Sequence, residues 1–320
     1  MKILFMLRDA FYDANPKLIH DAKLLGAQVK FLYTDHGIDK KELIEQVKDV
    51  DIIVVAVVKI DQEVIDAAPQ LKYIIKYGAG YDNIDVEYAF QKGIPVTNAP
   101  GQNAESVADH AFGLMLTAAR KIPQKHQEIK ADHWELSMGN EIYRKRLGII
   151  GFGSIGQAIA RRAAGFNMET ICYGNYKDFD AAAKWNVSFV DLNELFSSSD
   201  FIIISTSLSE NNRKMVNKET LSLMKPTAFI INISRGGLID EGDLVHALKE
   251  NKIRGAALDV FEKEPPTGEL AKLPNVIATP HIGGATFEAI ERIGDITITN
   301  IKKFMDHKEL KHVIAPKTKI

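Results

Sequence analysis

The chain has 320 residues, a formal net charge of −2, 46% hydrophobic residues and a single cysteine. This length favours two domains, and the near-neutral charge gives no reason to expect a nucleic-acid partner or an anionic membrane surface. One cysteine excludes an intrachain disulfide, and no apolar stretch reaches the roughly 18 residues that a membrane span needs, so we expect a cytoplasmic protein.

The first hundred residues alternate short apolar runs with amphipathic stretches. Continuous apolar strands that alternate with helices are typical of a parallel sheet covered on both faces. Strands are predicted at residues 3–7, 29–33, 52–57, 73–76 and 95–97, and helices at residues 17–25, 40–47 and 63–67.

A long, mostly apolar helix is predicted from Ala104 to about Lys121, opened by Asn103 and closed before Pro123. A helix of this kind is usually buried, either between domains or in a subunit interface. The next segment, residues 124–143, is polar and irregular, and we interpret it as an arm or a linker.

A second alternating series starts at residue 147. It predicts another doubly wound parallel sheet, and such sheets bind ligands at the carboxyl ends of their strands. The predicted strands are residues 147–150, 170–173, 201–205, 228–233, 255–258 and 276–278, and the predicted helices are residues 154–164, 192–197, 218–224, 241–249 and from 287 onward.

The sequence Gly-Phe-Gly-Ser-Ile-Gly at residues 151–156 follows an apolar strand and opens a helix. In this context it predicts a dinucleotide-binding turn. Gly151 permits the tight turn, Gly153 lets the backbone approach the diphosphate, and Gly156 lets helix and strand pack closely. The helix N-terminus then offers free amides to the diphosphate. The alternative is a purely structural glycine turn.

The strand after this turn ends at Gly174 and Asn175, where an NAD site places a carboxylate for the ribose hydroxyls. Without that carboxylate a 2′-phosphate is not repelled, and Asn175 and Lys177 can meet it with a donor and a cation. The sequence therefore favours NADP over NAD. Two alternatives stay open: Lys177 is only a solvated lysine in an enzyme that accepts both cofactors, or a shifted loop places Asp178 on the ribose.

Three polar residues, Arg235, Glu264 and His281, follow predicted strands of the second series. The Arg235 guanidinium can hold the carboxylate of a 2-oxo acid with two hydrogen bonds and polarise its carbonyl. His281 can protonate the alkoxide that hydride transfer produces, and a neighbouring Glu264 favours its imidazolium form. Each residue alone could have a purely structural role. Together, beyond a dinucleotide turn, they predict a nicotinamide-dependent reductase or dehydrogenase acting on 2-hydroxy acids.

The chain resembles the D-isomer-specific 2-hydroxyacid dehydrogenases along nearly its whole length. The resemblance rests on Gly-Ala-Gly-Tyr-Asp-Asn-Ile-Asp at residues 78–85, the run at 98–109, the glycine turn and the three segments around Arg235, Glu264 and His281. It implies that these three residues are catalytic. It also implies that the backbone amides of Ala79 and Gly80, together with Arg235 and His281, bind the substrate.

The resemblance further implies an α/β fold of two doubly wound parallel-sheet domains with a cleft between them. A flavodoxin-like substrate-binding domain would comprise residues 1–99 and 289–320, and a Rossmann cofactor domain would comprise residues 100–288. Family members are commonly dimers, joined here through the helix and arm at residues 104–145. Trp134 would then reach the partner's active site or pack in the interface.

Most of the expected cofactor contacts also follow from this resemblance, with Asp259 on the carboxamide side of the nicotinamide. The full set of expected cofactor-binding residues is Gly151, Gly153, Ser154, Ile155, Gly156, Gly174, Asn175, Lys177, Thr206, Ile233, Ser234, Asp259, Gly283 and Gly284. No metal is expected, because no His, Cys or Asp cluster has ligand spacing. His110 and His133 are expected to have no catalytic part.

Two features of the sequence bear on the substrate. Residues 55–58 read Val-Ala-Val-Val where phosphoglycerate dehydrogenases carry Arg-Ser-x-Thr, which argues against a phosphorylated substrate. The run Thr-Ser-Leu-Ser at residues 206–209 is similar to that of glyoxylate/hydroxypyruvate reductases. We therefore favour a small 2-oxo acid such as glyoxylate or hydroxypyruvate. The alternatives are an NAD-dependent dehydrogenase of the phosphoglycerate or D-lactate type and, more remotely, a cofactor-sensing protein like the corepressors built on this fold.

Overall fold

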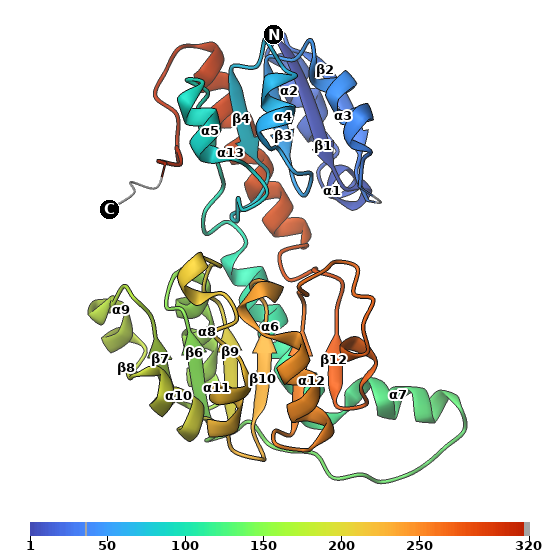
Figure 1. Cartoon of the computed structure of the whole chain (residues 1–320), viewed down its shortest axis with the longest axis vertical. Coiled ribbons are helices and arrows are strands. Elements are labelled where there is room, and N and C mark those ends of the chain that lie inside the picture. Colours follow the sequence, from blue (N-terminus) through green and yellow to red (C-terminus); the bar gives the residue numbers. More distant parts are fainter. Residues whose placement is uncertain (36, 317–320) are drawn as a thin grey trace. The chain divides into compact units, whose positions relative to one another are not determined.

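The two alternating series of the sequence fold into two separate α/β units. The structure, a computed structural model, describes residues 1–35 and 37–316 (Figure 1). One unit comprises Met1–Asn103 together with the chain from Ala285, and the other comprises Ala104–Gly284. The first unit is therefore built from both ends of the chain. Its boundaries, at residues 103 and 285, each differ by four residues from the expected 99 and 289. Residues 317–320 of the expected C-terminal piece lie outside the described residues.

The sheet of the first unit has five parallel strands in the order β2-β1-β3-β4-β5, the flavodoxin-like order. In its centre, Phe5 of β1 lies between Phe31 of β2 and Val54 of β3. The strands are β1 (Lys2–Leu7), β2 (Gln28–Tyr33), β3 (Ile52–Val55), β4 (Tyr73–Lys76) and β5 (Val96–Thr97).

Helices cover both faces of this sheet and bury its apolar side chains. One face is packed by α1 (Asp9–Ala14), α2 (Lys17–Leu24) and α13 (Phe287–Met305), and the other by α3 (Lys40–Val47), α4 (Gln62–Asp66) and α5 (Val86–Gln91). Figure 1 shows α13, in red, beside the blue elements of the N-terminal half. The helices α1 and α5, each of six residues, were not predicted from the sequence.

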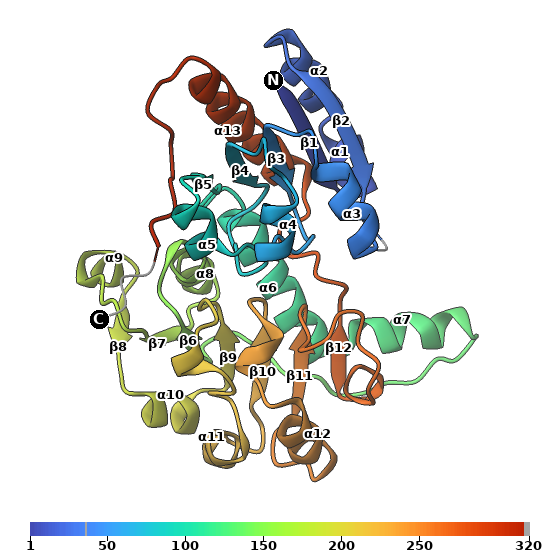
Figure 2. The same ribbon diagram turned by 45° about the horizontal axis from the view of Figure 1, so that its top comes forward.

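The second unit has seven parallel strands in the order β12-β11-β10-β9-β6-β7-β8, which Figure 2 shows side by side. This is the Rossmann order with one strand added beyond the sixth. The strands are β6 (Arg146–Ile150), β7 (Glu169–Tyr173), β8 (Val187–Phe189), β9 (Phe201–Ile204), β10 (Phe229–Asn232), β11 (Gly255–Leu258) and β12 (Val276–Ala278). Only β8, three residues long at the sheet edge, was not predicted.

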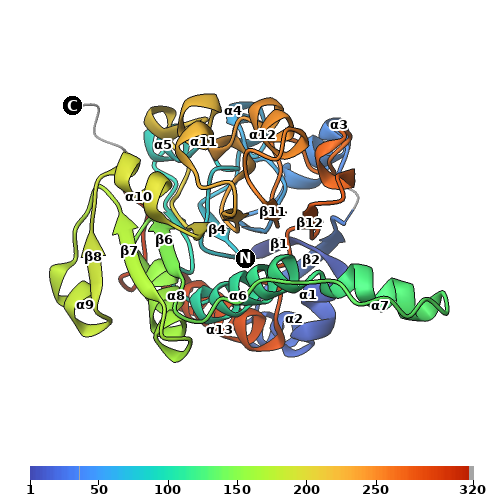
Figure 3. The same cartoon turned by 90° about the horizontal axis from the view of Figure 1, so that it is seen from below.

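Two helical layers enclose this sheet (Figure 3). One face is packed by α6 (Ala104–Arg120) and α8 (Ser154–Gly165), and the other by α10 (Leu192–Ser198), α11 (Lys218–Leu223) and α12 (Glu241–Lys249). The shorter elements are α9 (Phe179–Lys184) and the 3-10 turns η1 (Glu210–Asn212), η2 (Gly236–Leu238) and η3 (Leu270–Lys272).

The segment predicted to be irregular after α6 begins with a further helix, α7 (Ile122–Lys130). Pro123 lies in its first turn, where a missing N–H costs no hydrogen bond, so this proline starts a helix as well as ending one. None of the residues of α7 is buried, and Figures 1 to 3 show it extending away from the sheet. The stretch that follows exposes Trp134, Leu136 and Met138 to 90%, 93% and 82%.

Candidate active site

The candidate residues of the second unit follow the carboxyl ends of its strands. They lie on the loops there and on the first turn of α8. Because all seven strands run parallel, these loops share one edge of the sheet. The strand order reverses between β6 and β9, and the glycine turn follows β6 at this point. Open α/β sheets bind their ligands at such a switch point.

The three glycines of the turn have the backbone properties that the sequence predicts. Gly151 has φ of +99°, and a Cβ there would lie 2.7 Å from the amide nitrogen of Thr206. A Cβ on Gly156 would lie 2.2 Å from the carbonyl oxygen of Gly151, so any side chain would push α8 away from β6. A Cβ on Gly153 would meet no atom within 4 Å. The space over Gly153 is therefore open to a ligand.

The start of α8 also fits a diphosphate. Its N-cap residue is Gly153, which gives no side-chain hydrogen bond to the first turn. In contrast, α9, α10 and α12 are capped by the carboxylates of Asp178, Asp191 and Asp240. The first amides of α8 thus receive no side-chain cap, and a helix N-terminus of this kind favours an anion.

Hydrogen bonds join the loops on both sides of the switch point. The Ser205 hydroxyl donates to the carbonyl oxygen of Gly151 at 2.8 Å. The Ser234 hydroxyl donates to the carbonyl oxygen of Thr206. The loops after β6, β9 and β10 therefore form one connected surface, which carries Thr206, Ile233 and Ser234.

At the end of β7, Asn175 and Lys177 are exposed, while Gly174 is half-buried. Asp178, the carboxylate that a shifted loop would place on a ribose, accepts the amide of Ala181 at 3.0 Å and caps α9. It also accepts a hydrogen bond from Gln157 at 3.4 Å. Asp178 thus has a structural role in the folded chain.

Arg235 lies on the loop after β10, whose backbone is held by the buried side chain of Asn232. The Asn232 carboxamide accepts the amide of Ser234 at 3.0 Å and donates to the carbonyl oxygen of Arg235 at 2.9 Å. Asn232 begins the sequence segment around Arg235, but no role was assigned to it from the sequence alone. The available signal was a polar residue at the last position of an otherwise apolar strand.

Gly236 brings the Arg235 loop against the loop after β11. A Cβ on Gly236 would lie 1.9 Å from the carbonyl carbon of Phe261, so the two backbones are in direct contact. Phe261 in turn donates its amide to Oε1 of Glu264 at 3.3 Å. The sequence-predicted Arg235 and Glu264 are therefore carried by two loops that touch.

Glu264 and His281 meet, as the sequence predicts for residues that follow adjacent strands. Oε2 of Glu264 lies 2.9 Å from Nδ1 of His281, and the two side chains are 36% and 40% exposed. His281 has φ of +54°, in the left-handed region. Its amide donates to the carbonyl oxygen of Asp259 at 2.9 Å, which helps to hold this backbone conformation.

Asp259, at the end of β11, is only 1% exposed, and donors from several elements surround its carboxylate. Burial acts to raise its pKa, but hydrogen bonds from His110, Thr279 and the amides of Ile282 and Gly283 outweigh burial and lower the pKa below its usual value. His110, which was expected to have no catalytic part, contacts this carboxylate, with Nε2 lying 3.2 Å from Oδ1. The sequence offered no signal for this contact, because it joins distant parts of the chain.

The remaining predicted substrate contacts, Ala79 and Gly80, lie in the first unit, on the loop after β4. The Asn98 carboxamide donates to the carbonyl oxygen of Ala79 at 2.6 Å. The amide of Ala99 donates to the carbonyl oxygen of Gly78 at 2.9 Å. Asn98 is 8% exposed. A buried side chain thus holds the backbone whose amides the family resemblance assigns to a substrate carboxylate.

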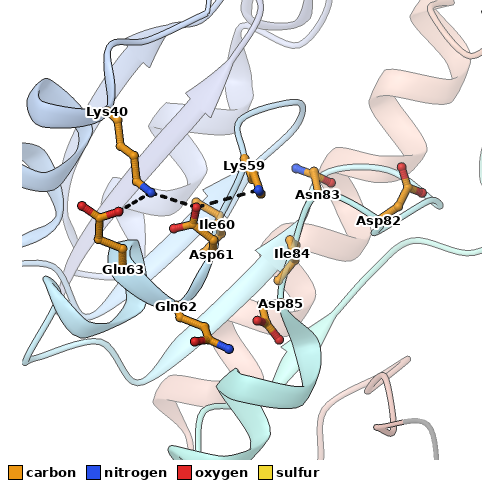
Figure 4. Close-up of a pocket in the computed structure, with 10 residues that line it drawn as sticks. All are labelled: Lys40, Lys59, Ile60, Asp61, Gln62, Glu63, Asp82, Asn83, Ile84 and Asp85. Carbon is orange, nitrogen blue, oxygen red and sulfur yellow. Dashed lines mark hydrogen bonds and ion pairs between the residues drawn. The ribbon is translucent and has the colours of Figure 1, made fainter. Parts of the chain in front are cut away.

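The first unit also contains a pocket of about 430 Å³ lined by the starts of α3, α4 and α5 (Figure 4). Its charged groups are used within the unit. Asp61 caps α4 and accepts a hydrogen bond from Lys40 at 3.0 Å, and Lys40 also pairs with Glu63. Asp85 caps α5. We place no part of the candidate site in this pocket.

Residues 1–35 and 37–316 contain neither a metal-binding cluster nor a helix able to span a membrane. No group of three or more His, Cys, Asp or Glu side chains in these residues has an arrangement that could hold a metal ion. None of the helices described there combines the length and the apolar character required to cross a bilayer.

A Rossmann sheet with this glycine turn, a second flavodoxin-like sheet and a paired histidine and glutamate define a dinucleotide-dependent enzyme of two α/β units. Residues 112–283 match the family model described as "D-isomer specific 2-hydroxyacid dehydrogenase, NAD binding domain". The chain belongs to this family. It is therefore an oxidoreductase that acts on CH–OH groups with a nicotinamide cofactor.

Similar proteins of known name agree with this assignment. The chain is 43% identical over 288 residues to a glyoxylate reductase of Pyrococcus furiosus, covering 87% of this chain and 86% of that protein. It is 43% identical over 277 residues to a hydroxypyruvate reductase of Thermotoga maritima, covering 84% and 90%. It is 46% identical over 283 residues to a D-3-phosphoglycerate dehydrogenase of Methanocaldococcus jannaschii, covering 87% of this chain but 54% of that protein.

Solved structures share the fold over almost the whole chain. An acyclic imino acid reductase in complex with NADPH and D-Arg has a TM-score of 0.88 at 30% identity, covering 98% of this chain and all of that one. A D-lactate dehydrogenase of Aquifex aeolicus, complexed with NAD and lactic acid, has a TM-score of 0.86 at 28% identity, covering 99% and 100%. Both confirm the predicted fold class.

Proposed function

We propose that this enzyme reduces a small, unphosphorylated 2-oxo acid to the D-2-hydroxy acid, with glyoxylate or hydroxypyruvate as its substrate. The observation that carries the proposal is the contact of 2.9 Å between His281 and Glu264, on the sheet edge that also bears the glycine turn. The similarity to a glyoxylate reductase and a hydroxypyruvate reductase supports this choice of substrate.

In this proposal the bound nicotinamide supplies the hydride for the carbonyl carbon. Arg235 holds the substrate carboxylate with two parallel N–H groups and draws electron density from the 2-oxo oxygen. The amides of Ala79 and Gly80 bind the same carboxylate. His281 gives the proton on Nε2 to the developing alkoxide, because its Nδ1 faces Glu264. The contact between Oε2 of Glu264 and Nδ1 orients the ring for this step. In the reverse direction His281 takes the proton from the hydroxyl group.

The cofactor is assigned to the same sheet edge. The glycine turn and the uncapped start of α8 would bind the diphosphate, and Asp259 would face the carboxamide side of the nicotinamide. The further contacts belong to the loops after β9, β10 and β12, at Thr206, Ile233, Ser234, Gly283 and Gly284.

NADP is proposed over NAD. No carboxylate occupies Gly174 or Asn175, Lys177 is exposed beside them, and Asp178 is engaged as the cap of α9. A 2′-phosphate at this position would meet the Lys177 cation. The Asp178 carboxylate of the same loop would not compete, because it is bound to the start of α9.

The test is steady-state oxidation of NADPH and of NADH with glyoxylate and with hydroxypyruvate. We expect turnover with both acids and a preference for NADPH. Oxidation of neither cofactor with any small 2-oxo acid would overturn the reductase assignment. A preference for NADH would overturn only the cofactor assignment, and would point to another group on the ribose.

A second candidate is an NAD-dependent dehydrogenase of the phosphoglycerate type, favoured by the 46% identity to such an enzyme. The absence of an arginine from residues 55–58 speaks against it. Higher kcat/KM with 3-phosphohydroxypyruvate than with hydroxypyruvate would support it. Pyruvate, tested in the same assay, distinguishes a D-lactate-type enzyme, and cofactor binding without turnover would distinguish a sensor of the corepressor kind.

We also propose a homodimer joined through α6, α7 and the arm that follows, with Trp134 either packed in the interface or reaching the partner's active site. The exposed Trp134, Leu136 and Met138 support this assignment, because they leave several large apolar side chains of one short segment uncovered. A cytoplasmic location completes the proposal, and the buried free thiol of Cys172 is compatible with a reducing compartment.

A further inference from the structure

His110 lies on α6, the largely apolar helix that packs against β10, β11 and β12 (Figure 3). Its Nε2 lies 3.1 Å from Oγ1 of Thr279 and 3.2 Å from Oδ1 of Asp259. Asp259 begins the loop that carries Glu264, and Thr279 begins the loop that carries His281. One side chain of the helix therefore contacts both loops of the candidate site at their first residues.

The hydrogen-bond geometry assigns the proton in this cluster. Thr279 donates to Oδ1 of Asp259 at 2.6 Å, which uses the one hydrogen of its hydroxyl group. The ionised carboxylate has no hydrogen to give. The Nε2 of His110 must then carry the hydrogen that points at Thr279 and Asp259, whatever the state of Nδ1. His110 acts as a donor to this pair.

Asp259 in turn holds three consecutive amides of the His281 loop. Its carbonyl oxygen accepts from His281 at 2.9 Å, Oδ1 accepts from Ile282 at 2.9 Å, and Oδ2 accepts from Gly283 at 2.8 Å. His281 lies in the left-handed region, where L residues are rarely found, so its backbone needs such restraints. The direction of the His281 ring depends on them.

The loop also packs directly on the two side chains. A Cβ added at Gly283 would lie 3.0 Å from Oδ2 of Asp259 and 3.5 Å from Cδ2 of His110. A side chain at this position would require Asp259 to shift by a few tenths of an ångström. The position of the loop is thus coupled to the position of His110 through contact as well as through hydrogen bonds.

We propose that His110 and Thr279 are positioning residues that hold Asp259, and through it the His281 loop, in the geometry for proton transfer. The proposal rests on the proposed function insofar as His281 is the proton donor. Without the N–H of His110, Asp259 keeps one donor fewer and the loop samples more conformations. A displacement of about 1 Å in a reacting group lowers turnover by up to about 100-fold.

The test compares His110→Leu, which removes the donor, with His110→Gln, whose amide N–H can replace it. The matched control is His246→Gln. His246 is an exposed histidine of α12, a helix on the opposite face of the sheet from α6, and it pairs with Glu250 just after that helix. Amide hydrogen exchange is measured for the peptide covering residues 279–284 in the unliganded protein. The kcat and KM values for the 2-oxo acid are measured in parallel.

We expect the amides of residues 281–283 to exchange at least about tenfold faster in His110→Leu, with kcat lowered about 10- to 100-fold and a smaller change in KM. His110→Gln should recover most of both properties, and His246→Gln should match the native protein. Unchanged exchange in His110→Leu, or equal impairment in the leucine and glutamine variants, would overturn the proposal. If His110→Leu does not fold, Thr279→Val is subject to the same two expectations. If the native protein reduces no 2-oxo acid, the proposed function fails while the exchange comparison still decides the positioning role.

Discussion

Nδ1 of His281 lies 2.9 Å from Oε2 of Glu264, although 17 residues separate them in the chain. The pair forms because β11 and β12 are adjacent parallel strands whose carboxyl ends lie together. With one ring nitrogen facing the carboxylate, the other is the nitrogen that can serve a substrate. The sheet topology therefore determines, before any ligand binds, that Nε2 of His281 is the nitrogen that can exchange a proton with the substrate.

The first prediction concerns this pair. His281→Gln should lower kcat about 10²- to 10⁴-fold, the usual contribution of a general acid, because the side chain can no longer transfer a proton. Glu264→Gln should lower kcat less, since it keeps a hydrogen-bonding group at the ring and removes only the charge. Steady-state assays of both variants, with circular dichroism to confirm folding, check this order. A larger loss of kcat in Glu264→Gln than in His281→Gln would contradict it.

The glycine turn offers a second, matched prediction. A methyl group at Gly153 meets no protein atom within 4 Å, whereas one at Gly156 lies 2.2 Å from the carbonyl oxygen of Gly151. Gly153→Ala should fold normally but bind the cofactor at least about tenfold more weakly, a loss of about 1.4 kcal/mol. Gly156→Ala should lose about 3 kcal/mol of stability through overpacking. Thermal unfolding and cofactor titration distinguish the two, and equal stability of both variants would refute the assignment.

The difference between what the sequence predicted and what it missed has a physical reason. Strands such as β9 (Phe201–Ile204) are continuous apolar runs, and parallel alternation places their carboxyl ends on one edge. The sequence therefore predicted that one edge of the sheet carries Arg235, Glu264 and His281, because each follows a strand.

His110 could not be found in this way. Its contact with Thr279 joins residues 169 positions apart, and no local pattern marks the one face of α6 that meets the β12 loop. The helix α7 was missed for a different reason. Pro123 was interpreted as the end of the preceding helix, but a proline in the first turn is compatible with the start of a new one. Long-range packing and the two-sided role of proline limit what the sequence alone predicts.

The third prediction concerns cofactor choice. Gly174 does not have a positive φ, and a Cβ there would lie 3.6 Å from the carbonyl oxygen of Tyr176, an ordinary contact. Gly174→Asp should therefore fold and place a carboxylate at the ribose. Repulsion of the 2′-phosphate should shift the ratio of kcat/KM values toward NADH by about 10- to 100-fold. Lys177→Ala should shift the ratio in the same direction by a smaller factor. An unchanged ratio in both variants would place the 2′ position elsewhere.

The fourth prediction concerns the single thiol. Burial raises the pKa of Cys172 to about 12, and the positive charge of Lys177 offsets only part of this effect. Native protein should therefore react with a thiol-specific disulfide reagent at pH 8 far more slowly than unfolded protein, because so little thiolate is present and the side chain is inaccessible. Reaction rates with and without denaturant test this. Equal rates in the two states would show that Cys172 is accessible in the folded chain.

The last prediction concerns the arm. If Trp134, Leu136 and Met138 pack in a homodimer interface, each contributes about 1.5–3 kcal/mol through burial. Replacing all three by serine should then weaken association by at least about 1000-fold, since the smallest total is about 4.5 kcal/mol. Sedimentation velocity over a range of concentrations should show a dimer for the native protein and a monomer for the triple variant. The matched control replaces Leu24, Phe31 and Tyr33, exposed to 72%, 44% and 61% on the first unit, and should remain dimeric. A triple arm variant that sediments like the native protein would exclude the arm from the interface.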